Sequence, residues 1–297
     1  MCKHAEKENG LHDLLEIMLE SLMVAERGEF LREQEEECEK LAGSLHTKGL
    51  TQAQVGQVFD EIYGEHYSKS SISRMIDYVR QEVSAWLVRG LDAYYPIVFV
   101  DCVHIKVFRK KKAATEAFYV ILGVTEEGTR EVLGIYNSPI ESANGWGNMF
   151  DDLHERGVES IGLMVADGLS GLDKVIGEKF PGTALQRCTT HLKRNMLARV
   201  RHGDKKELAD DEDVAFYFTY LNYAPQIQSM IYTTNWIERL QKDFRRVTRM
   251  RGAMPDENSV IVLMGKTAMD KESYQRVIPR IREDATLFPV DSASKGD

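Results

Sequence analysis

The chain has 297 residues, of which 43% are hydrophobic and 29% are charged. This composition can bury a sizeable core, which excludes a disordered, collagen-like or low-complexity chain. The apolar runs are too short to cross a membrane, and residues 1–10 lack the apolar stretch of a signal peptide. We therefore expect an intracellular protein without a membrane partner.

Charge is distributed unevenly along the chain. The formal net charge is −9, and the first 40 residues hold 12 acidic and 5 basic residues. Basic residues cluster further on, at residues 106–112, 187–201 and 239–251. Because the local field governs how a polyanion is bound, these clusters favour a nucleic-acid partner despite the net charge.

The first part of the chain reads as helical. Apolar spacing predicts a helix over residues 11–41, and two further helices over 51–63 and about 70–86. The last two are joined by a tight turn that contains Gly64, which is typical of a helix-turn-helix. Its second helix would offer Lys69, Ser73 and Arg74 to DNA. The alternative is an ordinary helical hairpin.

The middle of the chain alternates between strands and helices. Strands are predicted at residues 97–108, 117–124, 131–136, 161–166 and 184–188, with Tyr95-Pro96 as a boundary before the first. Helices are predicted at residues 141–156, 169–179, 190–200 and 234–251, with a charged loop at 201–213 and an aromatic stretch interrupted by Pro225 at 214–231. Three strands in a meander followed by strand–helix crossovers predict an α/β fold with a ribonuclease H-like mixed sheet.

Three acidic residues are candidates for catalysis. Asp101 interrupts an apolar strand, where a carboxylate is costly unless it is paired or binds a metal ion. Asp167 ends another apolar strand, and Glu238 heads a basic helix. Oxygen ligands of this kind suit two Mg²⁺ or Mn²⁺ ions, which can support phosphoryl transfer. The alternatives are capping or turn roles for the aspartates and an ion pair between Glu238 and Lys242.

Basic side chains next to these acids are candidates for DNA binding. They are Lys106, Arg109, Lys193, Arg194, Lys242, Arg245 and Arg249. Cys188 and His191 form a Cys-x-x-His motif that would need two more ligands to hold zinc. Packing, or DNA contacts from the neighbouring basic residues, is the other interpretation.

Four segments together resemble a known family. VFVDCVHIKV, VADGLSGL, LQRCTTHLKRN and TTNWIERLQKDFRRVTRMRGAMPDENSV are similar to the Mutator family of DDE transposases from bacterial insertion sequences. The resemblance implies Asp101, Asp167 and Glu238 as the catalytic and metal-binding triad. It also implies the Cys188–His191 motif, the basic residue Arg245, and a helix-turn-helix that recognises terminal inverted repeats.

The family resemblance also implies an enzymatic activity. Such enzymes cleave the ends of their element and join the 3′-hydroxyl to target DNA, as a homodimer or higher oligomer in the bacterial cytoplasm near the nucleoid. The expected domains are an acidic arm (1–44), a helix-turn-helix region (45–90), a catalytic domain (91–253) and a helical tail with a disordered end (254–297). Two alternatives stay open: an inactive DNA-binding remnant or repressor, and a structure-selective nuclease.

Departures from the family pattern predict a shortened copy. Asp167 and Glu238 are 71 residues apart, so the usual helical insertion is expected to be short, at about 201–232. The basic segment usual before the helix-turn-helix is missing. Gln241 stands where the family tends to have Asn.

Overall fold

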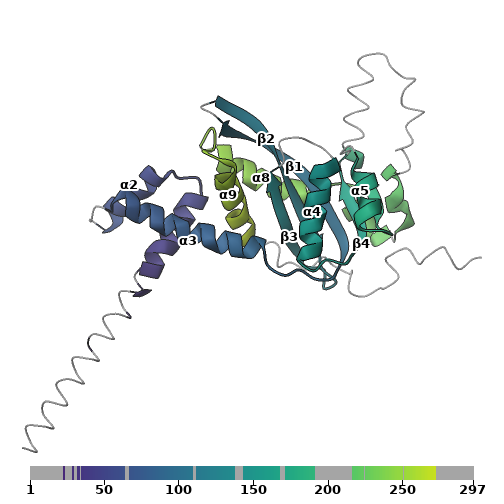
Figure 1. Cartoon of the computed structure of the whole chain (residues 1–297), viewed down its shortest axis with the longest axis horizontal. Coiled ribbons are helices and arrows are strands. Elements are labelled where there is room, and N and C mark those ends of the chain that lie inside the picture. Colours follow the sequence, from purple (N-terminus) through teal and green to yellow (C-terminus); the bar gives the residue numbers. More distant parts are fainter. Residues whose placement is uncertain are drawn as a thin grey trace, which may run out of the picture. The chain divides into compact units, whose positions relative to one another are not determined.

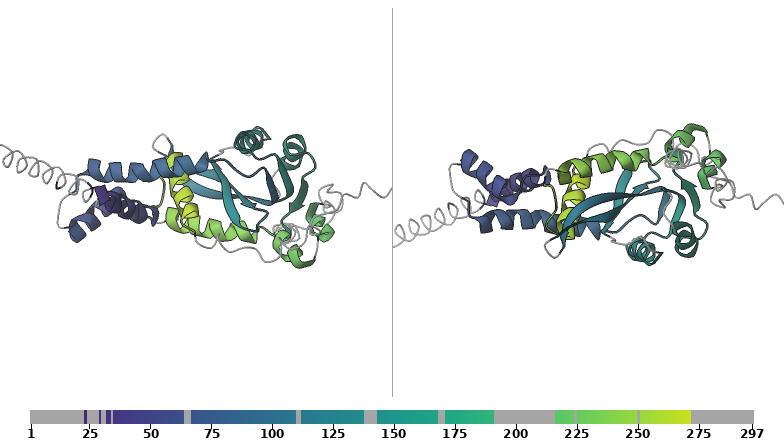
Figure 2. Two further views of the ribbon diagram at one scale, coloured as in Figure 1. Left: turned by 90° about the horizontal axis from the view of Figure 1, so that it is seen from below. Right: turned by 90° about the horizontal axis from the view of Figure 1, so that it is seen from above.

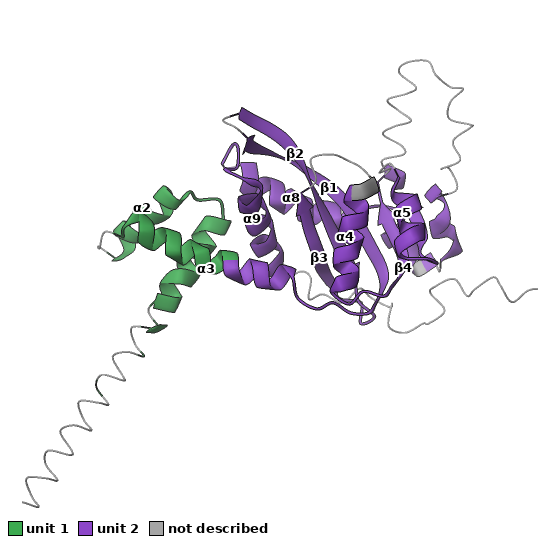
Figure 3. Ribbon diagram, viewed as in Figure 1, with its two compact units in different colours: residues 1–80 green, residues 81–297 purple. Residues whose placement is uncertain are grey.

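The computed structural model divides into two compact units, residues 1–80 and 81–297, which Figure 3 colours separately. The division falls within helix α3 (Lys69–Leu87). The described residues are 23, 29, 32–33, 35–63, 67–109, 112–137, 143–167, 171–190, 216–223, 225–249 and 251–271. Within these residues, no helix combines the length and apolar character needed to cross a membrane.

The first unit is a small helical cluster. Residues 35–47 are helical, so the first helix continues past its predicted end at residue 41, and most of the predicted range before residue 35 lies outside the described residues. α2 (Gln52–Tyr63) and α3 follow, close to their predicted ranges. Thr51 and Gln54 cap α2 reciprocally, since each side chain accepts a hydrogen bond from the backbone N–H of the other. Buried side chains from all three helices form the core: Cys38, Ala42, Val55, Phe59, Ile72 and Ile76. The helix-turn-helix interpretation concerns DNA recognition and stays a prediction.

The second unit is built on a mixed sheet of five strands (Figure 1). The strands are β1 (Tyr94–Arg109), β2 (Lys112–Val124), β3 (Arg130–Asn137), β4 (Ser160–Ala166) and β5 (Ala184–Arg187). Their spatial order is β3-β2-β1-β4-β5. The first three strands pair antiparallel, whereas β4 pairs parallel with β1 and with β5. This α/β arrangement is consistent with the predicted ribonuclease H-like fold.

Helices cover both faces of the sheet, as Figure 2 shows. One face packs against α7 (Pro225–Ile231), α8 (Asn235–Arg249) and α9 (Glu257–Met269). The other face packs against α4 (Ala143–Glu155) and α5 (Leu172–Lys179). Strand side chains alternate between the faces, so each face receives its own apolar core. We call the face that packs against α7, α8 and α9 the α8 face.

Two expectations about strand bounds are wrong. β1 starts at Tyr94 and runs through Pro96, which was expected to be a boundary. Pro96 is tolerated because the pairing with β4 steps from Tyr95 to Ile97 across it, so its missing N–H breaks no ladder bond. β2 starts five residues earlier than expected, because the hairpin stays paired as far as Arg109 and Lys112.

The aromatic-rich segment before α8 also differs from expectation. Pro225 does not interrupt it but begins α7, the helix position where proline costs no hydrogen bond. A short 3-10 helix, η2 (Thr219–Asn222), precedes α7. The predicted loop at 201–213, and the predicted helix at 190–200 beyond its first residue, lie outside the described residues.

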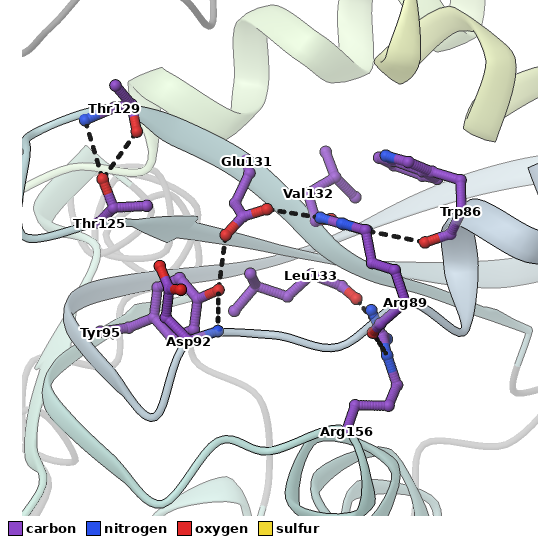
Figure 4. A network of polar contacts seen from close by, with 10 residues as sticks. All are labelled: Trp86, Arg89, Asp92, Tyr95, Thr125, Thr129, Glu131, Val132, Leu133 and Arg156. Carbon is purple, nitrogen blue, oxygen red and sulfur yellow. Dashed lines mark hydrogen bonds and ion pairs between the residues drawn. The ribbon is translucent and has the colours of Figure 1, made fainter.

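A polar network fixes the chain just before β1 (Figure 4). Glu131 of β3 accepts hydrogen bonds from Arg89 and from the Tyr95 hydroxyl, at 2.7 and 2.6 Å. Arg156, after α4, donates to the backbone oxygens of Arg89 and Leu133, at 3.0 and 2.6 Å. The start of β1 and the residues just before it are thereby tied to β3 and to the segment after α4.

Candidate active site

Three predicted site residues stand side by side across adjacent strands. Val100 of β1 is in register with Ala166 of β4, and Ala166 is in register with Arg187 of β5. The next residues along each strand are Asp101, Asp167 and Cys188. The Cys188 N–H donates to the Ala166 oxygen at 2.9 Å, which carries the parallel pairing up to this row.

Both aspartates belong to the α8 face. Phe99 and Val103, two residues before and after Asp101, lie in the core under α8, as does Val165, two residues before Asp167. Because side chains alternate along a strand, Asp101 and Asp167 share that face. Asp101 is only 7% exposed, and its Oδ1 accepts a hydrogen bond from the Cys102 N–H at 2.8 Å. Asp167 is half-buried.

Helix α8 carries Glu238 to the same face. The helix buries a regular stripe against the sheet: Ile237, Leu240, Phe244 and Val247. Glu238 lies in the first turn and is half-buried. The hydroxyl of the fully buried Thr234 lies 3.4 Å from Cys188 Sγ and 3.4 Å from Glu238 Oε1. Glu238 therefore lies close to the Cys188 end of the row.

The acidic residues do not form a complete metal cage as placed. Within the described part of the chain, no three His, Cys, Asp or Glu side chains form a group that could hold a metal ion. The donor chemistry nevertheless suits a hard divalent cation, because Asp101, Asp167 and Glu238 all offer carboxylate oxygens. The fold brings the three candidate acids to one face of the sheet, and Asp101 and Asp167 each follow a residue of a register pair on adjacent strands.

The outer side of α8 is strongly cationic. Five side chains are exposed along it: Arg239, Lys242, Arg245, Arg246 and Arg249. The one acidic residue after Glu238, Asp243, is half-buried and forms an ion pair with Lys271. A row of exposed positive charges on one helix, without an ion-pair partner among the described residues, suits the phosphate backbone of a nucleic acid.

The basic residues of the β1–β2 hairpin differ in their surroundings. Lys106 is exposed. Arg109 donates to Glu116 at 2.6 and 3.0 Å, and to Glu257 at 2.6 Å. The hydrogen bonds from Arg109, together with one from Asn137, lower the pKa of Glu116. Much of the charge of Arg109, which we predicted to bind DNA, is therefore matched by carboxylates within the fold.

Three other residues predicted to bind DNA belong to the first unit. Lys69 and Arg74 are exposed in the first turns of α3, and Ser73 is half-buried. His191, Lys193 and Arg194 lie outside the described residues, so the Cys-x-x-His motif is represented only by Cys188.

The burial of two polar residues near the site was not predicted from the sequence, although Gln241 was noted as a departure from the family pattern. Thr234 links Cys188 to Glu238, as described above. Gln241 is 1% exposed, and its Oε1 accepts a hydrogen bond from Arg245 Nη2 at 3.0 Å. Gln241 occupies a buried position of α8, between Ile237 and Phe244. A polar residue in the apolar stripe of an amphipathic helix was the available signal.

Comparison with known families identifies the chain. Residues 29–212 and 208–277 match the family model described as "Transposase, Mutator family". The chain belongs to the Mutator family of transposases. This Mutator-family chain is 25% identical over 261 residues to the transposase for insertion sequence element IS905 of Lactococcus lactis. It is 28% identical over 258 residues to that for ISRM3 of Rhizobium meliloti. It is 26% identical over 264 residues to that for IS256 in transposon Tn4001 of Staphylococcus aureus.

The matches cover most of the Mutator-family chain but less of its relatives. They span 76%, 74% and 76% of this chain for IS905, ISRM3 and IS256, and 66%, 64% and 68% of the relatives. The chain therefore spans about two thirds of the length of the curated relatives it matches.

One solved structure also matches the Mutator-family chain, at a low level. It is a chain of the simian T-cell lymphotropic virus intasome in complex with PP2A regulatory subunit B56 gamma. The TM-score is 0.31 at 11% identity, over 86% of this chain and 77% of that chain.

Proposed function

We propose that this Mutator-family chain is a transposase, which cleaves DNA at the ends of its element and joins the freed 3′-hydroxyl to target DNA. The observation that carries the proposal is the placement of Asp101 next to Asp167 on adjacent parallel strands, on the face that α8 covers. Family membership and the names of the relatives support the same reading.

Asp101, Asp167 and Glu238 would hold two Mg²⁺ or Mn²⁺ ions in this reading. Their carboxylate oxygens are the donors such cations prefer. When bound, the ions supply charge stabilisation to the attacking and leaving oxygens of the phosphodiester. The Thr234 hydroxyl, which lies between Cys188 and Glu238, orients the Glu238 carboxylate.

The chain's own cations would hold the DNA. Lys242, Arg245 and Arg249 lie on the exposed side of the helix that carries Glu238, so they bind phosphates next to the reacting one. Lys69 and Arg74 at the start of α3 bind the terminal inverted repeats, with Ser73 beside them. Cys188 packs against Thr234 and keeps the end of β5 in place. A homodimer or higher oligomer would bring two element ends together.

An isosteric substitution tests the triad. Asp101→Asn keeps the shape of the side chain but removes its charge, so cleavage of a duplex carrying the element end should fall by about 10²–10³-fold or more. End binding, measured by gel shift, should stay within a few-fold. Asp173→Asn is the matched control, because Asp173 is an exposed aspartate on α5, on the other side of the sheet.

The outcomes separate the candidate functions. Unchanged cleavage by Asp101→Asn would refute the triad. Binding of the element ends by the natural chain without any cleavage in Mg²⁺ favours an inactive DNA-binding remnant or repressor. Cleavage of branched DNA regardless of sequence favours a structure-selective nuclease.

A further inference from the structure

Tyr232 occupies a fixed position at the edge of the candidate site. It lies between the end of α7 and the start of α8, two residues before Thr234. Its carbonyl oxygen accepts hydrogen bonds from both the N–H and the hydroxyl of Thr189, each at 3.0 Å. Its own N–H donates to the Gln228 oxygen at 3.1 Å. The backbone of Tyr232 is thus tied to the residue that follows Cys188.

The Tyr232 ring is open to solvent although its backbone is fixed. The residue is 36% exposed, and its ring centroid lies 5.9 Å from that of Tyr220, with 52° between the ring planes. Leu221 of η2 is also exposed, at 56%. A large ring that is exposed but contacts another ring loses little conformational freedom when a flat ligand stacks on it.

The charged residues that follow Tyr232 in the chain indicate which kind of ligand would stack on its ring. Along the chain, the Tyr232 ring is followed by the carboxylate of Glu238 and then by the exposed cations of α8, beginning with Arg239 and Lys242. Proteins that bind single-stranded nucleic acid combine an aromatic ring, on which bases stack, with a row of cations, which pair with phosphates. A base has the flat π surface that the ring fits, and its phosphate carries the charge that α8 complements.

We propose that Tyr232 is a base-stacking platform for an unpaired nucleotide of the DNA, next to the phosphate that reacts. The inference rests on the proposed function, because it takes the acidic row as the place of reaction. The platform holds the end of an opened strand and so sets the position of its terminal phosphate relative to Asp101 and Asp167. It tolerates any base, because every base offers a π face.

The test compares two duplexes of one sequence, one blunt and one with a short 3′ overhang that carries 2-aminopurine. Binding is measured by anisotropy and stacking by quenching of the 2-aminopurine fluorescence, in the Asp101→Asn background so that the DNA is not consumed. Tyr232→Leu removes the ring and Tyr232→Phe keeps it. Phe108→Leu is the control, since Phe108 is a 50% exposed ring on the β1–β2 hairpin.

The expected result is specific to the overhang. Tyr232→Leu should weaken overhang binding about 5- to 100-fold, which corresponds to one stacked base, and should abolish the quenching. Its binding of blunt duplex should not change. Tyr232→Phe and Phe108→Leu should both behave like the parent protein, because the stacking ring is retained in each.

Three results would overturn the inference: quenching that persists in Tyr232→Leu, no overhang preference in the parent, or a changed oligomeric state in Tyr232→Leu with unchanged overhang binding. A changed oligomeric state would mean that the Tyr232 ring contacts a second copy of the chain. The proposed function fails separately. Quenching in the Asp101→Asn background, together with a natural chain that does not cleave DNA in Mg²⁺, contradicts that function alone. Cleavage by the natural chain, together with overhang binding that Tyr232→Leu leaves unchanged, contradicts the platform alone.

Discussion

Gln241 offers a direct test of what a buried polar side chain in the apolar stripe of α8 costs in stability. Its side chain is 1% exposed, and the Oε1 accepts from Arg245. Its Nε2 is buried and has no hydrogen-bond partner among the described residues. A buried donor that has given up water without a replacement costs about 1–3 kcal/mol of folding free energy. We therefore expect that an apolar residue of similar length at this position stabilises the protein.

The expected size follows from what Gln241→Met removes. The substitution eliminates the unpaired donor and keeps a flexible side chain of similar volume in the cavity. It also removes the acceptor for Arg245, but that exposed guanidinium regains water, so the loss is at the low end of about 0.5–1.5 kcal/mol. The net gain is about 1 kcal/mol, which raises the melting temperature of a unit of this size by about 2–4 °C.

Calorimetry and urea denaturation measure this change, and Gln241→Ala is the control. Alanine also removes the unpaired donor but leaves a cavity, so it should be less stable than Gln241→Met by about 2 kcal/mol or more. DNA cleavage should fall in Gln241→Met if the amide is kept for the bound substrate. The reasoning is refuted if Gln241→Met is less stable than the natural chain, because the amide would then have a partner in solution.

Two further predictions concern the sheet. Arg109 holds the pKa of Glu116 low, so the ionised form stabilises the fold above the unfolded pKa of about 4.3, and this contribution disappears as pH falls through the lowered value. Glu116→Gln should therefore cost about 1–2 kcal/mol at pH 7 and much less at pH 3, by urea midpoints; a gap independent of pH would contradict the ion pair. Gly162→Ala would place Cβ 2.7 Å from the backbone oxygen of Pro96 in β1, so it should destabilise by about 1–3 kcal/mol in thermal melts. Gly177→Ala, which meets nothing within 4 Å on α5, should instead stabilise by about 0.5–1 kcal/mol, and equal effects of the two would be evidence against the close approach of β1 and β4.

Much of the fold was predictable because the apolar pattern is strong. The alternation after Asp101 predicts a strand with one buried face, and Val103, Ile105 and Val107 are indeed buried while Lys106 is exposed. The alternation says nothing about the partner of each strand, so the extension of β2 to Lys112 was missed. Pairing with β1 supplies the hydrogen bonds there, and local composition does not report it.

The acidic residues of the candidate site can be recognised in the sequence, but the contacts made by the side chains around them cannot. An acid that ends or interrupts an apolar strand is visible in the sequence, and Asp101 and Asp167 are of this kind. The partner of Arg109 is not visible, because Glu257 is 148 positions away in the chain. The basic cluster at 106–112 therefore suggested more positive charge for DNA binding than the structure offers, because Arg109 is paired with two carboxylates. The contact between Thr234 and Cys188 could not be predicted either, because it depends on where β5 ends in the fold.

The position of β1 in the sheet has a consequence for biosynthesis. β1, β2 and β3 pair through short connections, so they can assemble as soon as they leave the ribosome. β4 joins the other edge of β1 only after α4 has been made and the crossover closes. A nascent chain that ends before β4 holds Asp101 on an open edge with no second carboxylate beside it. The acidic pair is thus completed by a late, long-range strand pairing, and a partly translated chain cannot carry out the reaction proposed for the finished protein.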